Sequence, residues 1–284
     1  MLGPKILRER EKGKPVLVAH RGMVKQHQEN TLSGIKAAIA SDKVDGFEFD
    51  VVMIKDGTLV LFHDDNLKRM TGVDKDIRET TWPELKELII PKDLIVDGVP
   101  MSYPTEERIP RLIDVLEEVK GTDCFFDLDM KSSFPKWSTR HTGTEVGKLV
   151  NQVGVADQMV STTIDFFMLY MLKKTCPAVS VGFAYDDDIP VSAKFLNWVM
   201  ERDIVGRWIN ASVTALEYTV IDDNSIQKYH KRNKPVGTYT LFPLGKETEL
   251  KEAHTKEVQR LVSLDVDWIE SDNPLMVREA LGWS

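Results

Sequence analysis

The chain has 284 residues, of which 42% are hydrophobic and 29% charged, and its formal net charge at pH 7 is −8. This length suits a single α/β barrel, for which about 250 residues is typical, and the composition is that of an ordinary globular protein. The acidic balance argues against a general nucleic-acid-binding protein, which would need a basic surface, although a local group of cations can still bind a phosphate.

The N-terminal segment contains several charges and lacks the apolar stretch of a signal peptide. Nowhere in the chain is an uncharged run long enough to span a bilayer. The two cysteines, Cys124 and Cys176, are too few for a disulfide framework and favour free thiols in a reducing compartment. We therefore expect a cytoplasmic protein without a transmembrane segment. Peripheral contact with a membrane and the oligomeric state stay open.

The first elements of the chain are a predicted strand and helix. Residues 16–19 form a short apolar run that is typical of a buried strand. Residues 29–40 carry apolar side chains three and four positions apart, which predicts a helix. Asn30 or Thr31 can cap its N-terminus with a side-chain oxygen.

The next two extended runs, residues 46–54 and 58–62, are separated by an Asp-Gly turn signal. The link between them is too short for a parallel crossover, so they should form an antiparallel hairpin. Such a hairpin would bring His63, which follows the second run, to the end of the first run that carries Glu48 and Asp50.

The pattern then loosens over residues 64–108, which are polar and interrupted by four prolines. One modest helix is expected here, over residues 82–89. We interpret the segment at about 65–108 as a small insertion that follows the hairpin and lies over one end of the fold. A regular helix over residues 109–120 comes after it, with a proline in its first turn and a glycine at its end.

Strand-like and helical patterns alternate through the rest of the chain. The expected strands are residues 123–130, 158–163, 180–185, 207–210, 235–240 and 267–271. Together with the runs at 16 and 46, they make eight β-then-α units, and no glycine-rich nucleotide fingerprint accompanies them. This pattern favours a closed (β/α)8 TIM barrel over an open doubly wound sheet. We expect residues 1–284 to form a single domain.

In such barrels the active site lies at the C-terminal ends of the strands, where this chain places carboxylates and cations. Glu48 and Asp50 are two residues apart, so they share one face of their strand, and Asp129 follows on the next barrel strand. Three carboxylates make an oxygen-rich site suited to Mg²⁺ or Ca²⁺, whereas zinc would call for a His-x-His pair or a cysteine cluster. Arg21 and Lys131 add positive charge suited to an anion, most simply a phosphate.

His20 and His63 also follow predicted strands, and both suit general acid–base catalysis. The imidazole group titrates near pH ~6.5, so each protonation state is accessible at neutral pH. In hydrolysis of a phosphodiester, one imidazole would activate the attacking oxygen and the other would protonate the leaving oxygen. The three histidines in charged surroundings, His141, His230 and His254, are expected to be surface residues.

Several motifs together resemble the glycerophosphodiester phosphodiesterase family. The matching pieces, which agree in order and spacing over nearly the whole chain, are His20-Arg21-Gly22, Glu29-Asn30-Thr31, Glu48-x-Asp50, Asp56-Gly57, His63-Asp64 with Leu67, Arg69 and Thr71, IPRLIDVL, Asp129-x-Lys131 and Ser271-Asp272. Each motif alone is weak, but this succession is specific.

The resemblance implies a TIM barrel with a small insertion, and an enzyme that hydrolyses glycerophosphodiesters to glycerol 3-phosphate and an alcohol. It implies a divalent metal ion held by Glu48, Asp50 and Asp129. It also implies that His20 and His63 are the catalytic pair and that Arg21 and Lys131 bind the phosphate.

The chain departs from the family pattern at a few positions. Asp129 stands where the family usually has Glu, and Gln28 replaces the proline that commonly precedes the Glu-Asn-Thr motif. The segment STTID lacks the usual Ser-Phe, and Tyr239 replaces a frequent Trp. The first change bears on the metal, and the last two bear on the substrate pocket.

Two alternatives to this function stay open. The same chemistry would serve a lysophospholipase D-like enzyme that cleaves lysophospholipid or sphingolipid head groups, which would need an apolar groove at the barrel mouth. A catalytically inactive barrel that binds a phosphorylated ligand or a protein is the other alternative. The presence of His20, His63 and Lys131 together counts against it.

Overall fold

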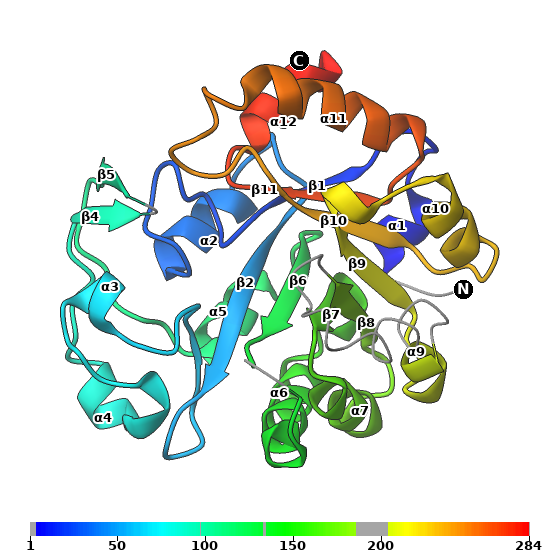
Figure 1. Cartoon of the computed structure of the whole chain (residues 1–284). Helices are drawn as coiled ribbons and strands as arrows, with labels where there is room; N and C mark the ends of the chain where they lie inside the picture. The colour runs from blue at the N-terminus through cyan, green and yellow to red at the C-terminus, as the bar shows by residue number, and fades with distance from the viewer. Residues whose placement is uncertain (1–3, 97, 133–134, 186–203, 284) are drawn as a thin grey trace, which may run out of the picture.

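Eight parallel strands form a closed barrel (Figure 1) in the computed structural model, which describes residues 4–96, 98–132, 135–185 and 204–283. Each strand pairs with its neighbours in chain order, and the barrel closes where β1 pairs with both β2 and β11. The barrel strands are β1 (Val16–Ala19), β2 (Gly46–Met53), β6 (Phe125–Met130), β7 (Met159–Thr163), β8 (Ser180–Tyr185), β9 (Val213–Glu217), β10 (Val236–Leu241) and β11 (Trp268–Ser271). The expected TIM barrel is confirmed.

Helices surround the ring of strands (Figure 1). They are α1 (Lys5–Glu9), α2 (Leu32–Ile39), α5 (Leu112–Val119), α6 (Arg140–Val153), α7 (Phe166–Thr175), α9 (Ile204–Trp208), α10 (Asp223–His230), α11 (Lys251–Ser263) and α12 (Pro274–Leu281). Within the described ranges, none of the helices combines the length and apolar composition needed to cross a membrane.

One expected strand is wrong. Residues 207–210 were predicted to be extended, but they form the end of α9 and the turn that follows it, and the barrel strand is β9, a few residues later. A short apolar run has the same appearance in a buried helix and a buried strand, so periodicity alone cannot separate the two.

The predicted hairpin is confirmed, because β3 (Leu59–Leu61) pairs with β2 in antiparallel register. The pairing places Val51 opposite Leu61, and the amide of Phe62 donates to the carbonyl of Asp50 over 3.1 Å. This pairing therefore places His63, the next residue, close to the carboxylates of β2, Glu48 and Asp50.

The insertion between β3 and α5 builds a small layer of its own. It contains α3 (Lys68–Thr71), α4 (Trp82–Leu85), β4 (Asp93–Val96) and β5 (Val99–Ser102). Hydrogen bonds join it to the loop that follows β1. Tyr103 Oη of the insertion donates to the carbonyl of Val24 over 3.2 Å, and Gln28 Nε2 of the loop donates to the carbonyl of Thr105 over 2.8 Å. The insertion thus packs on the C-terminal end of the barrel, as expected.

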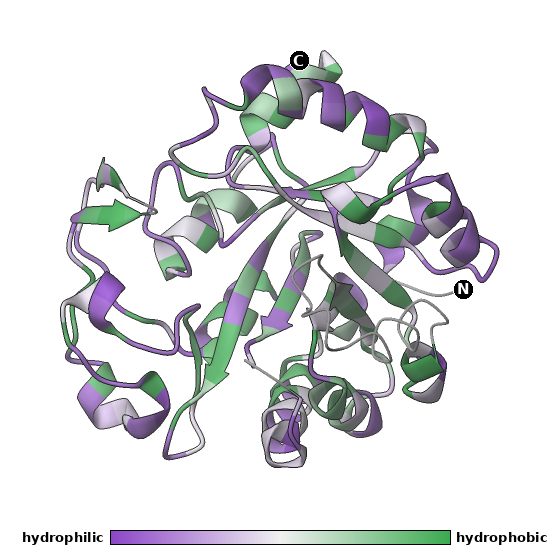
Figure 2. Ribbon diagram, viewed as in Figure 1, coloured by the Kyte–Doolittle hydropathy of each residue, from purple (hydrophilic) through white to green (hydrophobic). Residues whose placement is uncertain are grey.

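The interior of the barrel changes from apolar to polar along its axis. At the N-terminal end of the strands, Val16, Phe125 and Trp268 pack together. Gly237 leaves room for the indole, since a Cβ at this position would lie 1.8 Å from a ring carbon of Trp268. Figure 2 shows hydrophilic bands interrupting the hydrophobic β2 and β6, where carboxylates replace apolar side chains.

His254 corrects another expectation. It was predicted to lie on the surface, but it is only 4% exposed, and its Nδ1 accepts a hydrogen bond of 2.7 Å from the amide of Phe242. Burial lowers the pKa of His254. The ring therefore serves as a neutral acceptor that holds the end of β10.

His230 is only half-buried, and it joins α10 to the N-terminal end of β11. Its Nε2 lies 2.7 Å from Asp267 Oδ2, and Arg10 Nε donates to the other oxygen of Asp267 over 2.7 Å. The hydrogen bond with Asp267 raises the pKa of His230.

This ion pair predicts a pH-dependent contribution to stability. A raised histidine pKa stabilises the fold below the unfolded pKa of ~6.5, and the contribution is lost as pH rises through the folded value. Relative to wild type, His230→Gln should unfold with about 1 kcal/mol less free energy near pH 6, and the difference should shrink above about pH 8. Urea unfolding at both pH values measures it, with exposed His141→Gln as the control; an equal loss at both would contradict the argument.

Candidate active site

A cavity of about 310 Å³ opens at the C-terminal ends of the barrel strands. It contains every residue that the sequence predicted for the site, namely His20, Arg21, Glu48, Asp50, His63, Asp129 and Lys131, and it is completed by Ser132, Thr162, Thr163, Ile164, Ala184, Tyr239, Thr240 and Glu270. The structure thus brings together residues that lie on or just after strands far apart in the sequence, from β1 to β11. Their roles stay predictions.

His20 follows β1 and is held by a carboxylate from the opposite end of the chain. Its Nδ1 lies 2.6 Å from Asp272 Oδ1, and the second oxygen of Asp272 accepts from the amide of Leu244 over 2.7 Å. Burial would raise the pKa of Asp272, but the charge and hydrogen bond of His20 lower it. With Nδ1 engaged, the Nε2 of His20 points toward Glu48, at 3.7 Å from Oε2.

His63 is held in the same manner by the residue that follows it. Its Nδ1 lies 2.8 Å from Asp64 Oδ1, and Arg69 Nε donates to the other oxygen of Asp64 over 2.6 Å. Although burial would raise the pKa of Asp64, the hydrogen bonds of His63 and Arg69 hold it well below its usual range. Each histidine is therefore oriented through Nδ1 by an ionised carboxylate.

The Glu-Asn-Thr motif has a physical explanation for each member. Glu29 accepts hydrogen bonds from Arg69 on one side and from Arg21 on the other, at 2.7 and 3.2 Å. Asn30 locks Asp50: its Nδ2 donates to Oδ2 over 2.7 Å, and its Oδ1 accepts from the Asp50 amide over 2.9 Å. Thr31 caps α2, as its predicted position allowed.

Arg21 lies at the centre of the site with φ of 55°. Its amide donates to Glu48 Oε2 over 2.9 Å, and its Nη1 donates to Glu29. Its Nε is buried and, among the described residues, has no hydrogen-bond partner, although Asp50 Oδ2 lies 3.3 Å away. The guanidinium is therefore fixed by carboxylates, and a fixed guanidinium suits the binding of an anionic ligand.

Lys131 links two of the predicted metal ligands. Its Nζ lies 2.9 Å from Asp129 Oδ2 and 3.2 Å from Asp50 Oδ1. Burial would lower the pKa of Lys131, but the two carboxylates raise it, so the ammonium stays charged. For Asp50 the directions are reversed. Burial would raise its pKa, but the positive charges of Lys131 and Arg21 lower it far below its usual value.

Glu48 shares the interior of the barrel with Asp127 and Glu270, two carboxyls that were not among the predicted site residues. Burial, together with Asp50, raises the pKa of Glu48 well above its usual value, and burial with Asp129 raises that of Asp127 to about 7. Glu270 is also buried, and its pKa is raised by burial and by Asp127. The interior therefore holds more carboxyl groups than the cations around it can neutralise.

This shortage of positive charge bears on the predicted metal ion. In the part of the chain that the structure describes, no three His, Cys, Asp or Glu side chains are arranged as a ready-made metal site. The donor chemistry nevertheless fits, because Glu48, Asp50 and Asp129 offer oxygen ligands along one wall of the cavity. A divalent cation there would relieve the repulsion that raises the pKa of Glu48.

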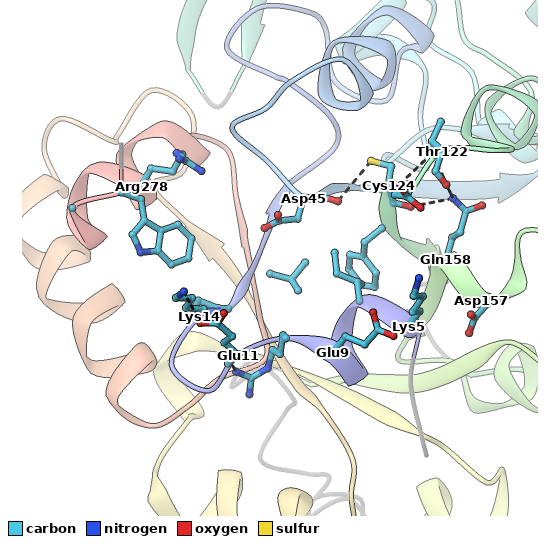
Figure 3. Close-up of a pocket in the computed structure, with 18 residues that line it drawn as sticks. Lys5, Glu9, Glu11, Lys14, Asp45, Thr122, Cys124, Asp157, Gln158 and Arg278 are labelled. Atoms are coloured by element: carbon cyan, nitrogen blue, oxygen red, sulfur yellow. Dashed lines mark hydrogen bonds and ion pairs between the residues drawn. The ribbon is translucent and has the colours of Figure 1, made fainter.

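A larger cavity, of about 1010 Å³, lies at the other end of the barrel (Figure 3). Cations such as Lys5 and Lys14 alternate around it with carboxylates such as Glu9 and Asp45. Among the described residues that line it, there is no predicted site residue and no histidine. Size alone therefore does not select the candidate site, and we base the choice on the convergence of the predicted acid–base groups and phosphate ligands in the smaller cavity.

Comparisons with known proteins show the family and the fold of the chain. The sequence profile of the glycerophosphoryl diester phosphodiesterase family matches residues 20–276. A glycerophosphodiester phosphodiesterase of Caldanaerobacter subterraneus is 28% identical over 61% of the chain, and a lysophospholipase D of Homo sapiens is 29% identical over 46%. These alignments cover 67% and 42% of the two relatives' own lengths.

Solved structures share the fold. A phosphodiesterase of Oleispira antarctica, in complex with the product sn-glycerol-3-phosphate, superposes with a TM-score of 0.72 at 22% identity. The superposition covers 94% of this chain and 97% of that one. At this identity the likeness concerns the fold of the barrel.

Proposed function

The chain belongs to the glycerophosphoryl diester phosphodiesterase family and is a phosphodiesterase of that family, and we propose that it hydrolyses glycerophosphodiesters to sn-glycerol 3-phosphate and an alcohol. The observation that carries this proposal is the pair His20 and His63, each oriented through Nδ1 by a carboxylate, in one cavity with Arg21 and Lys131. Such a pair suits in-line displacement at a phosphodiester, where one proton is removed and one is supplied.

Arg21 and Lys131 would bind the phosphate of the substrate. Both are held rigidly by carboxylates, so little ordering is needed when the anion arrives. One histidine would accept the proton of the attacking oxygen, which belongs to water or to a hydroxyl of the glycerol. The other would donate a proton to the leaving alcohol. Because both Nδ1 atoms are engaged, proton transfer would occur at Nε2.

A divalent metal ion, Mg²⁺ or Ca²⁺, is part of the proposal. Glu48, Asp50 and Asp129 would hold it, and when bound it would neutralise charge on the non-bridging oxygens of the phosphate. Asp129 is one methylene shorter than the Glu that is usual in the family. Because Asp129 is one of the three proposed ligands, we expect Asp129→Ala to raise the metal concentration needed for activity.

The size of the cavity supports a small, water-soluble substrate. About 310 Å³ is at the lower end of the range for ligand pockets, which suits a glycerophosphodiester. A lysophospholipid is the second candidate, because the apolar side chain of Ile164 lines the cavity while being 40% exposed, so an acyl chain could leave the cavity beside it.

The first experiment is release of glycerol 3-phosphate from glycerophosphocholine, in Mg²⁺, in Ca²⁺ and in EDTA, with lysophosphatidylcholine as a parallel substrate. Metal-dependent release from glycerophosphocholine would support the leading proposal. Choline release from the lysolipid alone would favour the second candidate. Neither product under any ion would contradict both.

Arg69 offers a test of how the histidine is positioned, because it joins Asp64 to Glu29 and touches neither predicted catalytic group. Arg69→Met should lower kcat about 10- to 100-fold with a small change in KM, since His63 would lose its fixed orientation. It should also reduce the free energy of unfolding by about 2 kcal/mol, because two carboxylates lose their partner.

Steady-state kinetics and urea unfolding test the Arg69 prediction together. Arg69→Lys keeps the charge but cannot make both bidentate pairs, so it should recover only part of kcat. The exposed Arg108→Met, from the same insertion, is the matched control. An unchanged kcat in Arg69→Met would show that Asp64 orients His63 without it.

A further inference from the structure

Aromatic side chains, two of them exposed and three half-buried, form a continuous cluster on one flank of the barrel, outside the site described above. Figure 1 shows α6, α7 and α9 side by side there. The rings lie in contact: Trp137 with Phe167 (centroids 5.4 Å apart), Phe167 with Phe166 (4.3 Å), Phe166 with Trp208 (6.3 Å) and Trp208 with Tyr170 (5.0 Å). We call these five residues the aromatic surface.

The exposure of this surface is unusual for such large apolar groups. Trp137 and Trp208 are each 56% exposed, whereas tryptophan is generally well buried in folded proteins. Ile164, which is 40% exposed, lies two residues before Phe166 and also lines the catalytic cavity. The aromatic surface therefore begins at the rim of the active site and continues down the outside of the barrel.

The short segments that carry these rings are basic, although the chain as a whole is acidic. Residues 135–144, 166–176 and 204–216, which carry these rings, contain no Asp or Glu, although 45 of the 284 residues are acidic. Their charged residues are Lys136, Arg140, Lys173, Lys174 and Arg207. The guanidinium of Arg140 lies over the Trp137 ring, 4.6 Å from its centroid.

Internal hydrogen bonds hold the aromatic surface in shape. Asp165, which is fully buried, caps α7 through the amide of Phe167 (3.0 Å). The same carboxylate accepts from Thr139 Oγ1 (2.6 Å) and Ser132 Oγ (3.0 Å), which fixes the loop that carries Trp137. The rings are therefore preorganised, so contact with a partner would cost little ordering entropy.

We propose that the aromatic surface docks the protein on a lipid bilayer that contains anionic lipids. Tryptophan and tyrosine favour the interface between water and lipid, where an apolar ring and a polar edge are both satisfied. Lysine and arginine beside them are attracted by anionic head groups. Docking there would place the bilayer next to the mouth of the cavity. The proposal concerns binding alone and does not depend on the proposed reaction.

Co-sedimentation with vesicles tests this proposal. Wild type should sediment with vesicles of equimolar phosphatidylcholine and phosphatidylserine, and Trp137→Ala/Trp208→Ala should lower the bound-to-free ratio about tenfold or more. Trp283→Ala, in the cavity at the opposite end of the barrel, is the matched control and should bind as wild type does. Circular dichroism and thermal unfolding would establish that the variants are folded.

A charge variant provides an independent readout. In Lys136→Glu/Lys174→Glu, each lysine lost should weaken binding to phosphatidylserine-containing vesicles by about fivefold or more, and binding to phosphatidylcholine alone should change far less. If the tryptophan variant does not fold, this charge variant tests the proposal instead. Wild type that fails to sediment, or a tryptophan variant that binds like wild type, would overturn the proposal. So would sedimentation velocity showing that the tryptophans hold two copies of the chain together while vesicle binding is unchanged.

Discussion

Replacing His20 by alanine is expected to lower kcat by about 10²- to 10⁴-fold while the fold remains intact. The imidazole is only partly buried, and its polar contacts are with Asp272 and Glu48, both at the cavity rather than in the apolar core. The main loss should therefore appear in turnover, with a smaller loss in the free energy of unfolding because the carboxylate of Asp272 loses its partner. Hydrolysis of glycerophosphocholine at saturating substrate, with thermal unfolding beside it, measures both.

His63→Ala should show a loss of similar size, because a phosphodiester displacement needs both a base and an acid. The double variant should be little worse than either single one, since groups that act as a unit are not additive. Exposed His141→Ala serves as the control. Near-normal turnover in either single variant would contradict the proposed acid–base role of that histidine, even if the enzyme remained metal-dependent.

Local patterns were sufficient to predict most of the barrel. The strands at β1, β2 and β8 are apolar runs between clear turn signals, and the short link after β2 leaves an antiparallel hairpin as the only connection. The prediction failed where a pattern was ambiguous, as at residues 207–210, and where burial depends on distant packing. His254 has polar neighbours in sequence, but α11 turns its ring toward β10.

The site shows the same division. Residues at strand ends could be predicted to converge, because the C-terminal ends of barrel strands meet at one mouth. The contacts between them could not, since the pairing of His20 with Asp272 spans 252 residues. Asp127 and Glu270 alternate with apolar residues on their strands, and sequence alone does not show that both meet inside the barrel.

The charges of the site form one connected system. Successive ion pairs connect His63 with Arg21 by way of Asp64, Arg69 and Glu29. Arg21 in turn contacts Asp50. A change at one member should therefore affect the orientation of the others. Glu48 differs from the other carboxylates, because the two largest effects on its pKa are burial and the charge of Asp50, and both raise it.

Glu48→Gln should consequently have opposite effects on stability and on activity. In EDTA at about pH 8, the variant should unfold with about 1 kcal/mol more free energy than wild type, because a neutral amide of the same shape avoids a buried, repelled charge. It can still accept the hydrogen bond from the Arg21 amide. Activity with metal should fall by about 10²-fold or more, the scale of a lost electrostatic group in the transition state.

The pH dependence of this effect has a definite sign. Since the folded pKa of Glu48 is raised, wild type loses stability as pH rises through that value, and the loss is absent below the unfolded carboxyl pKa of about 4.3. The gain in Glu48→Gln should therefore vanish near pH 4, where both side chains are neutral. Mg²⁺ or Ca²⁺ should stabilise wild type by mass action and the variant much less.

Urea unfolding in EDTA and in each metal, at both pH values, separates the two roles of Glu48, with the exposed Glu106→Gln as the control. A variant that is less stable than wild type in EDTA would show that the carboxylate is needed for the fold itself. A variant that gains stability but keeps its metal-dependent activity would remove Glu48 from the ligand set. Stability gained together with activity lost is the signature of a carboxylate kept in an unfavourable place for the sake of a bound cation.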